Sequence, residues 1–189
     1  MRFAKLTALT AMASATALAL AACGQKTATS DAGGNNMVVA DTGTVAPASG
    51  GQAFANTAAA SDAFEIATSR LALTNSSSSG IKKFAQSMID AHTDSTAKLQ
   101  TAASAASPAI TPDPTLTAEQ QAKLDAMKPL SGAAFDTAYA AGQTEGHQKT
   151  LDTLRAYSTS GDVPSLKSFA ATLVPIVTAH LNMAKSLKA

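Results

Sequence analysis

Residues 135–154 constrain the fold of this chain most, because they repeat apolar side chains at the spacing of an α-helix. Six of them recur every three or four residues and share one helical stripe: Phe135, Tyr139, Gln143, His147, Leu151 and Leu154. An amphipathic helix turns such a stripe toward the protein core. The sequence therefore predicts a helix that buries an amide and an imidazole among apolar side chains.

Three further long segments carry a helical pattern, and all four lie after residue 51, where Ala becomes abundant. The predicted helices span about residues 52–74, 81–105, 132–158 and 163–187. A short helix ending near Met127 is predicted after a proline-rich stretch, because Thr117 to Gln120 resembles a capping box. Ser131 and Asp162 are the expected N-caps of the last two helices.

Two short connections and one long one join the four predicted long helices. The long connection, residues 106–130, is ample to run back along a helix of about 38 Å, at 1.5 Å rise per residue. This pattern favours an all-α, ferritin-like four-helix bundle made of two antiparallel hairpins joined by a crossover. A plain up-down-up-down bundle is the alternative. We expect the bundle domain to cover residues 52–189.

The predicted core is thin. The chain has six Phe, two Tyr and no Trp, and Ala dominates its helices. Because small side chains bury little apolar area each, we expect modest stability, or a further contact with a protein partner or a second copy of the chain.

Residues 1–22 have the pattern of a bacterial secretory signal peptide. Arg2 and Lys5 precede an apolar run that is too short for a comfortable membrane span. The run closes with Leu20-Ala21-Ala22-Cys23, which resembles the lipobox of bacterial lipoproteins. This resemblance implies cleavage before Cys23 and attachment to a membrane through acyl chains on that cysteine. An ordinary cleavage site beside a chance cysteine is the alternative.

Residues 23–51 are rich in Gly, Ser, Thr, Asn and Ala, so we expect a flexible tether between the lipidated cysteine and the bundle. Gly24 follows the cysteine where lipoproteins kept at the inner membrane often carry Asp. The resemblance therefore implies the cell envelope, on the periplasmic side of the outer membrane. Since Cys23 is the only cysteine, no disulfide within the chain can support the fold.

The charge balance excludes one class of partner. Removal of the predicted signal peptide takes away Arg2 and Lys5, which leaves the positive and negative side chains almost equal in number. Nucleic-acid binding requires a basic face, so no nucleic-acid partner is expected. The sequence also contains no Ser-His-Asp grouping, phosphate loop, haem-attachment motif or cysteine-based metal site. No catalytic or cofactor-binding residue is predicted, which argues against an enzyme.

The three histidines of the chain all lie on inward-facing helical stripes and are the candidates for function. Imidazole binds Zn, Cu and Fe, and helical bundles hold metals on side chains from facing helices. The candidate ligands of one transition metal ion are Glu65, His92, His147 and His180. Axial spacing puts the first three near one level, with His180 about four to seven residues away. The alternative is a set of neutral buried imidazoles hydrogen-bonded to Gln143, Glu65 or the backbone.

The residues before the histidines exclude a di-iron centre. Bundles of that class carry a Glu three residues before a ligating His, whereas this chain has Ile89, Thr144 and Val177 there. Met88 and Met183 lie one helical turn from two of the histidines. They are interpreted either as ligands of Cu(I) or as core residues that fill gaps.

Other polar residues on these helices are predicted to face solvent. These are Asp90, Asp94, Asp136, Glu145 and Asp152. Pro175 lies inside the last predicted helix, where it should remove a hydrogen bond and bend the helix near His180.

Several groups of residues resemble a bacterial envelope family, the domain of unknown function family 4142, often labelled "predicted outer membrane protein". The matching groups are Phe64-Glu65-Ile66 with Leu71-Ala72, Ile81-Lys82-Lys83-Phe84-Ala85 leading to His92-Thr93, Phe135-Asp136-Thr137-Ala138-Tyr139 with Gly146-His147-Gln148, and Leu173-Val174-Pro175 with His180-Leu181-Asn182. The resemblance implies a ferritin-like fold and an envelope location, and no established activity. The family tends to carry Asp immediately before the second-helix histidine, whereas this chain has Ala91 there and Asp90 one residue earlier. An Asp–His pair is therefore not expected on that helix.

Together these features predict a cell-envelope lipoprotein whose bundle is a non-catalytic structural, stress or interaction module. The alternative is a metal-binding bundle that holds Zn, Cu or Fe on the inward-facing histidines and Glu65.

The lipobox can be tested in cells of the source bacterium or a related host. Cys23→Ser removes the predicted acylation site, so the protein should move from the membrane to the soluble fraction. Fractionation followed by immunoblotting measures this shift. Membrane retention of Cys23→Ser equal to that of the wild type would contradict the predicted anchor.

Overall fold

The computed structural model describes residues 50–188. The predicted signal peptide, Cys23 and the tether up to residue 49 lie outside the described residues, so they stay predictions. The first helix already includes Gly50, slightly before the expected start of the bundle.

Five helices and no strand make up residues 50–188, which confirms the all-α fold class. They are α1 Gly50–Asn75, α2 Ser79–Ser104, α3 Ala118–Met127, α4 Gly132–Ser160 and α5 Pro164–Lys185. The four long helices match the predicted segments to within two residues at each end, and α3 is the predicted short helix. None of these helices combines the length and the apolar character that crossing a membrane requires.

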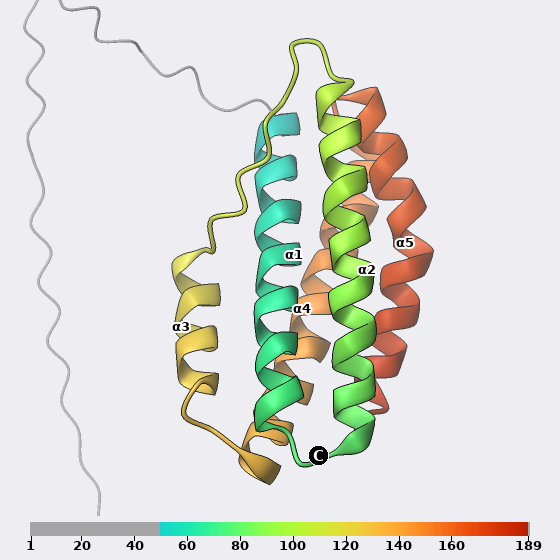
Figure 1. Ribbon diagram of the computed structural model, residues 1–189. Coiled ribbons are helices and arrows are strands. Elements are labelled where there is room, and N and C mark those ends of the chain that lie inside the picture. The colour runs from blue at the N-terminus through green and yellow to red at the C-terminus, as the bar shows by residue number, and fades with distance from the viewer. Residues whose placement is uncertain (1–49, 189) are drawn as a thin grey trace, which may run out of the picture. The chain divides into compact units, whose positions relative to one another are not determined.

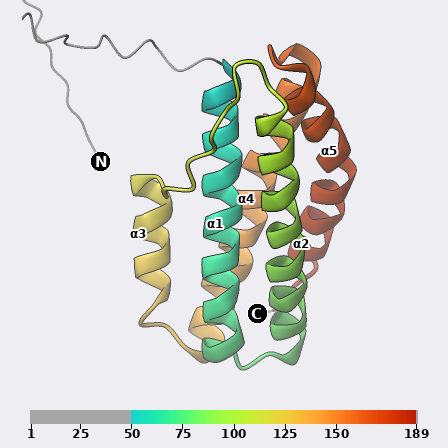
Figure 2. The ribbon, with the colours of Figure 1, turned by 45° about the horizontal axis from the view of Figure 1, so that its top comes forward.

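Contacts between helix ends decide the connectivity. At one end of the bundle, Nδ2 of Asn75 in α1 donates to the carbonyl oxygen of Leu130 just before α4, at 3.0 Å. At the other end, Oγ of Ser165 in α5 donates to the carbonyl oxygen of Ala102 in α2, at 2.7 Å. α2 and α4 therefore run in the same direction, and the connection between them, which contains α3, runs back along α1 (Figures 1 and 2). This confirms the crossover and excludes the up-down-up-down alternative.

Local capping explains two of the helix starts and corrects a third. Thr117 and Gln120 form the predicted capping box of α3. Oγ of Ser78 accepts from the backbone N–H of Ile81 and caps α2. The N-cap of α5 is Val163, so the expectation that Asp162 caps α5 is wrong. The Asp162 carboxylate instead accepts hydrogen bonds from Gly51 N at the start of α1, at 3.3 Å, and from the Tyr157 hydroxyl at 2.8 Å.

The apolar core has two parts, one toward each end of the bundle. The part nearer the start of α1 contains Phe54, Leu99, Leu154, Leu166, Phe169 and Leu173. The part nearer the end of α1 contains Ile81, Phe84, Met88, Phe135 and Tyr139. Burying each large side chain stabilises the fold by roughly 1.5–3 kcal/mol. The two parts together hold the intervening segments of all four long helices in place.

Candidate metal centre

Between the two apolar parts lies a layer of buried polar side chains, to which every long helix contributes. This buried polar layer consists of Asp62, Glu65, His92, Gln143, His147 and His180, none more than 9% exposed. Burying a polar group is costly unless it finds a partner, so the partners of each member indicate what the layer can do.

The three histidine rings meet in the middle of this layer. Their ring centroids are 5.6 Å apart for His92 and His147, 5.8 Å for His92 and His180, and 5.5 Å for His147 and His180. One ring nitrogen from each lies within 4.8 Å of the other two. Among the described residues, no other group of three or more His, Cys, Asp or Glu has this geometry.

Each histidine has one buried ring nitrogen without a hydrogen-bond partner. These atoms are Nε2 of His92, Nε2 of His147 and Nδ1 of His180. An unsatisfied buried polar atom costs about 1–3 kcal/mol, so three of them close together are a substantial cost. A bound metal ion would offset this cost, because each atom can donate its lone pair to the metal.

Asp62 fixes the orientation of the His92 ring through a hydrogen bond to Nδ1. Nδ1 of His92 lies 2.8 Å from Oδ1 of Asp62, and the Thr96 hydroxyl donates to Oδ2 of the same carboxylate at 3.2 Å. Burial works to lower the pKa of His92, but the hydrogen bond to Asp62 and the charges of Glu65 and Asp62 raise it overall. A carboxylate on Nδ1 leaves Nε2 directed at the other rings, which is the pattern of metal-ligating histidines.

A backbone carbonyl fixes the ring of His147 in the same way. Nδ1 lies 2.8 Å from the carbonyl oxygen of Gln143, which can only accept, so Nδ1 carries the proton and Nε2 keeps its lone pair. Burial, together with the nearby His92 and His180, lowers the pKa of His147 to about 3. His147 is therefore neutral at pH 7, as a metal ligand must be.

His180 joins the group from α5. Burial and the charge of His92 lower its pKa to about 4, so it too is neutral at pH 7. The expectation that His180 lies about four to seven residues from the level of the other histidines is wrong, because its ring meets both of theirs. α4 ends at Ser160 and α5 begins at Pro164, so the two helices are antiparallel. Helical side chains lean toward the N-terminus of their own helix, so the rings of His147 and His180 lean toward each other.

Glu65, the fourth predicted ligand, lies beside the histidine group and not within it. Its Oε1 is 3.9 Å from Nδ1 of His147, the nitrogen that already donates to Gln143. Its Oε2 accepts a short hydrogen bond from Nε2 of Gln143. Burial raises the pKa of Glu65 to about 7, opposed by the charge of His92 and the Gln143 hydrogen bond. In this arrangement Glu65 supports the position of Gln143, which in turn orients His147.

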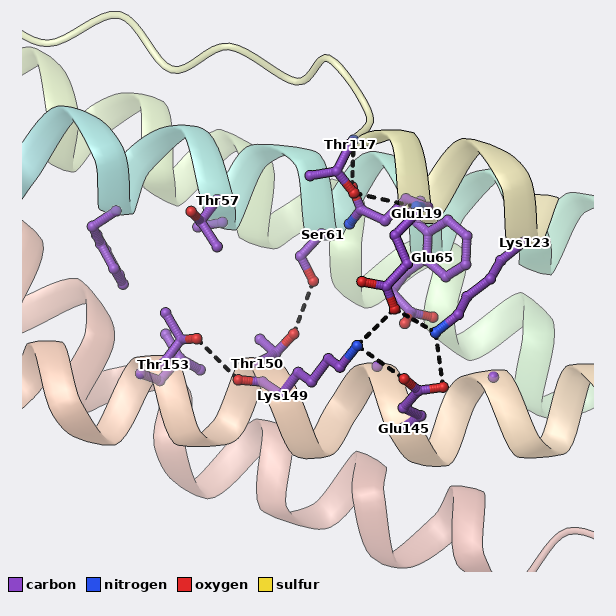
Figure 3. Close-up of a pocket in the computed structure, with 17 residues that line it drawn as sticks. Thr57, Ser61, Glu65, Thr117, Glu119, Lys123, Glu145, Lys149, Thr150 and Thr153 are labelled. Atoms are coloured by element: carbon purple, nitrogen blue, oxygen red, sulfur yellow. Dashed lines mark hydrogen bonds and ion pairs between the residues drawn. The ribbon is translucent and has the colours of Figure 1, made fainter. Parts of the chain in front are cut away.

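Glu65 also lines a cavity of about 210 Å³ between α1, α3 and α4 (Figure 3). Four charged side chains surround it, three of them exposed and Lys123 half-buried: Lys123 and Lys149 each pair with both Glu119 and Glu145, at 2.8–2.9 Å. Glu145 thus faces solvent, as predicted. These pairs link α3 to α4 over the cavity, but exposed pairs of this kind stabilise a fold little.

Asp62 is the site residue that the sequence pattern did not single out. It precedes Glu65 by three residues and so shares its face of α1, a signal that would have indicated a second inward carboxylate. Asp90 and Asp94 are exposed, as predicted, and Asp62 supplies the carboxylate partner of His92 from a different helix. The Asp–His pair therefore exists, but across two helices and not along one.

The packing resolves two other expectations, for the methionines and for Asp136, and the bend expected at Pro175 stays a prediction. Met88 is fully buried in the apolar core, which favours the gap-filling role for this residue, whereas Met183 is 42% exposed. Asp136 was expected to face solvent, but it is buried at 3% exposure beside the α1–α2 turn, where Oγ of Ser77 donates to it at 3.2 Å. Pro175 lies exposed inside α5, which continues through it.

The histidine group fits a transition metal after a small contraction. Three atoms within 4.8 Å of one another lie at most about 2.8 Å from their common centre, whereas Zn–N bonds measure about 2.0–2.1 Å. Each ring would have to move inward by at most about 0.8 Å, which side-chain rotation can supply. The donor set, three imidazoles of which those of His92 and His147 are held by outer hydrogen bonds, suits Zn, Cu, Ni, Co or Fe.

Two glycines on α4 offer a matched test of how tightly Glu65 is held. Gly→Ala inside a helix normally adds about 0.5–1 kcal/mol of stability. A Cβ on Gly142 would meet only the flexible end of Met127 at 2.8 Å, so Gly142→Ala should stabilise the protein. A Cβ on Gly146 would lie 2.7 Å from Oε1 of the buried Glu65, so Gly146→Ala should destabilise it by about 1–2 kcal/mol. Urea unfolding measures both, and equal effects of the two substitutions would contradict the close packing at Glu65.

The burial of Glu65 predicts a pH dependence. Its pKa is raised from 4.5 to about 7, so its contribution to stability is fully present below pH 4.5 and is lost as the pH rises through about 7. Glu65→Gln removes this loss of stability at high pH, because glutamine does not ionise. In metal-free protein it should increase the free energy of unfolding at pH 8, relative to its effect at pH 4.5, by on the order of 3 kcal/mol.

Urea unfolding across this pH range measures the difference between Glu65→Gln and wild type. Glu145→Gln is the control, because Lys123 and Lys149 lower the pKa of the exposed Glu145 and its small contribution is lost as the pH falls. Its difference curve should be nearly flat between pH 4.5 and 8, because that loss takes place at lower pH. A difference for Glu65→Gln that stays flat or falls with rising pH would contradict a buried, mostly neutral Glu65.

Comparison with known proteins identifies the family to which the chain belongs. Searches of curated proteins and of solved structures each found no match to this chain. The family model described as "Domain of unknown function (DUF4142)" matches residues 36–187, which include every member of the buried polar layer. The chain therefore belongs to the DUF4142 family.

Proposed function

We propose that this protein is a cell-envelope protein that binds one transition metal ion on His92, His147 and His180. The observation that carries the proposal is the meeting of three buried histidines: one ring nitrogen of each lies within 4.8 Å of the other two, and each ring has a buried nitrogen without a hydrogen-bond partner. Neutral buried imidazoles of a purely structural kind would be expected to satisfy both nitrogens. Here each of the three histidines leaves one buried nitrogen unsatisfied.

The donor set defines the class of metal. Ca²⁺ and Mg²⁺ prefer oxygen ligands, and Cu(I) prefers sulfur, whereas three imidazoles suit Zn²⁺, Cu²⁺, Ni²⁺, Co²⁺ or Fe²⁺. Asp62 and the carbonyl of Gln143 act as outer partners that fix the ring orientations of His92 and His147. Because metal binding needs neutral His92, it should release the proton that Asp62 favours on that ring.

The location of this function follows from the N-terminal sequence, which lies outside the described residues. A signal peptide ending at residue 22 and acylation at Cys23 would hold the bundle at the periplasmic side of the outer membrane. There the protein could bind or store a metal ion without performing catalysis, which agrees with the lack of any catalytic motif in the sequence.

The test is metal analysis of the full chain purified without a histidine tag. We expect about one equivalent of a transition metal in the wild type and loss of at least nine-tenths of it in His147→Ala, since two imidazoles alone bind weakly. Asp62→Asn should weaken the affinity about 10- to 100-fold, because it removes the outer partner of His92. Inductively coupled plasma mass spectrometry and competition with a chromogenic chelator measure content and affinity.

Glu65→Gln is the matched control. It alters a buried neighbour of the histidines without removing a ring nitrogen, so it should retain the metal. Loss of metal in Glu65→Gln as complete as in His147→Ala would place Glu65 among the ligands. Sub-stoichiometric metal in the wild type, unchanged by His147→Ala, would overturn the metal proposal and leave a non-catalytic structural or interaction module.

A further inference from the structure

A second cavity lies on the other side of the buried polar layer from Glu65. It has a volume of about 210 Å³ and is lined by residues of α1, α2, α4 and α5, including His92 and His180. His147 and Glu65 do not line it. The cavity therefore reaches the histidine group from the α2–α5 side and differs from the one in Figure 3, with which it shares only Ala58, Thr150 and Leu154.

Two residues that line this cavity have ring nitrogens that can bind a metal ion. His92 and His180 are each more than nine-tenths buried, and each has a ring nitrogen without a partner. Three histidines on a transition metal leave at least one coordination position for a ligand that is not part of the protein. A small molecule in this cavity would lie against two of the three ligands and could take that position.

The charge of the site favours an anionic head group. A divalent metal on three neutral imidazoles carries two positive charges, and Asp62 supplies only one negative charge behind His92. Asp62 is also occupied, since its two oxygens accept from His92 and Thr96. The remaining charges on the cavity lining, Asp94 and Lys98, are exposed and opposite in sign. One further negative charge on the ligand would balance the charge of the metal against the charges that line this cavity, from which Glu65 is absent.

The walls favour an aliphatic chain. Leu154, Phe169, Leu173 and Val177 form a buried apolar side, and Ile176, 38% exposed, extends it toward solvent. An apolar cavity of about 150 Å³ holds benzene, so about eight non-hydrogen atoms fit in this one. That is the size of a six-carbon carboxylate.

We propose that this cavity binds a short-chain aliphatic carboxylate, an inference that rests on the proposed metal site. Its carboxylate occupies the open position at His92 and His180, and its chain lies along the apolar wall of α5. Binding is a ligand exchange in which one oxygen of the carboxylate replaces a solvent molecule, with no covalent or redox step. Each buried methylene should strengthen binding about fourfold, until the chain reaches Ile176 and solvent.

The experiment uses the full chain loaded with Co²⁺, whose visible absorption changes with its ligands. Acetate, butanoate, hexanoate and octanoate are titrated at constant ionic strength, with hexan-1-ol and hexylammonium as head-group controls. We expect affinity to rise about 16-fold from acetate to butanoate and again to hexanoate, and to level off at octanoate. The alcohol and the ammonium ion should leave the spectrum unchanged.

Two alanines on α2 give matched variants. Ala91 is half-buried and lines the cavity, whereas Ala97 is exposed on the same helix and does not line it. Ala91→Leu should weaken hexanoate binding at least tenfold and acetate binding no more than twofold, because it obstructs the path of the chain. Ala97→Leu should change neither.

The outcomes separate the two proposals. Failure of Co²⁺ to bind to the wild type would overturn the metal site and with it this inference. Co²⁺ binding with no spectral response to carboxylates, or with equal affinity for all chain lengths, would overturn the inference and leave the metal site intact. An equal loss of hexanoate binding in Ala91→Leu and Ala97→Leu would also overturn it.

Discussion

The hydrogen bond between Asp62 and His92 is the interaction on which the arrangement of the buried polar layer most depends. It joins α1 to α2 at 2.8 Å inside the bundle, where both side chains are shielded from water. Breaking a buried pair leaves an uncompensated charge, which typically costs about 3–5 kcal/mol. The pair therefore fixes both the register of the first hairpin and the direction of the His92 ring.

The ring of His147 is held in the same way, through a hydrogen bond on one of its nitrogens. The side chain of Gln143 donates to the carboxylate of Glu65, and its backbone carbonyl accepts from His147. The inner nitrogens of the rings have no partner within the described part of the chain. A layer made only for structural specificity would be expected to satisfy its inner atoms as well, because unsatisfied polar groups destabilise the core that surrounds them.

The alanine-rich helices leave room for the buried polar layer. Small side chains let helix backbones approach closely, and Gly146 leaves room for the Glu65 carboxylate where any Cβ would collide with it. The larger apolar residues are gathered toward the two ends of the bundle, on either side of the layer. This division leaves two cavities beside the polar layer, one that reaches Glu65 and one that reaches His92 and His180. The apolar core is therefore not uniform along the bundle, because its large side chains are gathered on either side of the histidines.

The sequence by itself determined the helices and the inward position of all three histidines and favoured the crossover, because hydrophobic periodicity and loop length are local properties of the chain. Only the tertiary structure decided which ring nitrogens meet, that Asp62 and not Asp90 pairs with His92, and that His180 reaches the level of His147. Periodicity gives the face of a helix but neither its axial offset from a neighbour nor the lean of its side chains. Those two quantities are set by packing between antiparallel helices, and they bring three separate histidines into one group.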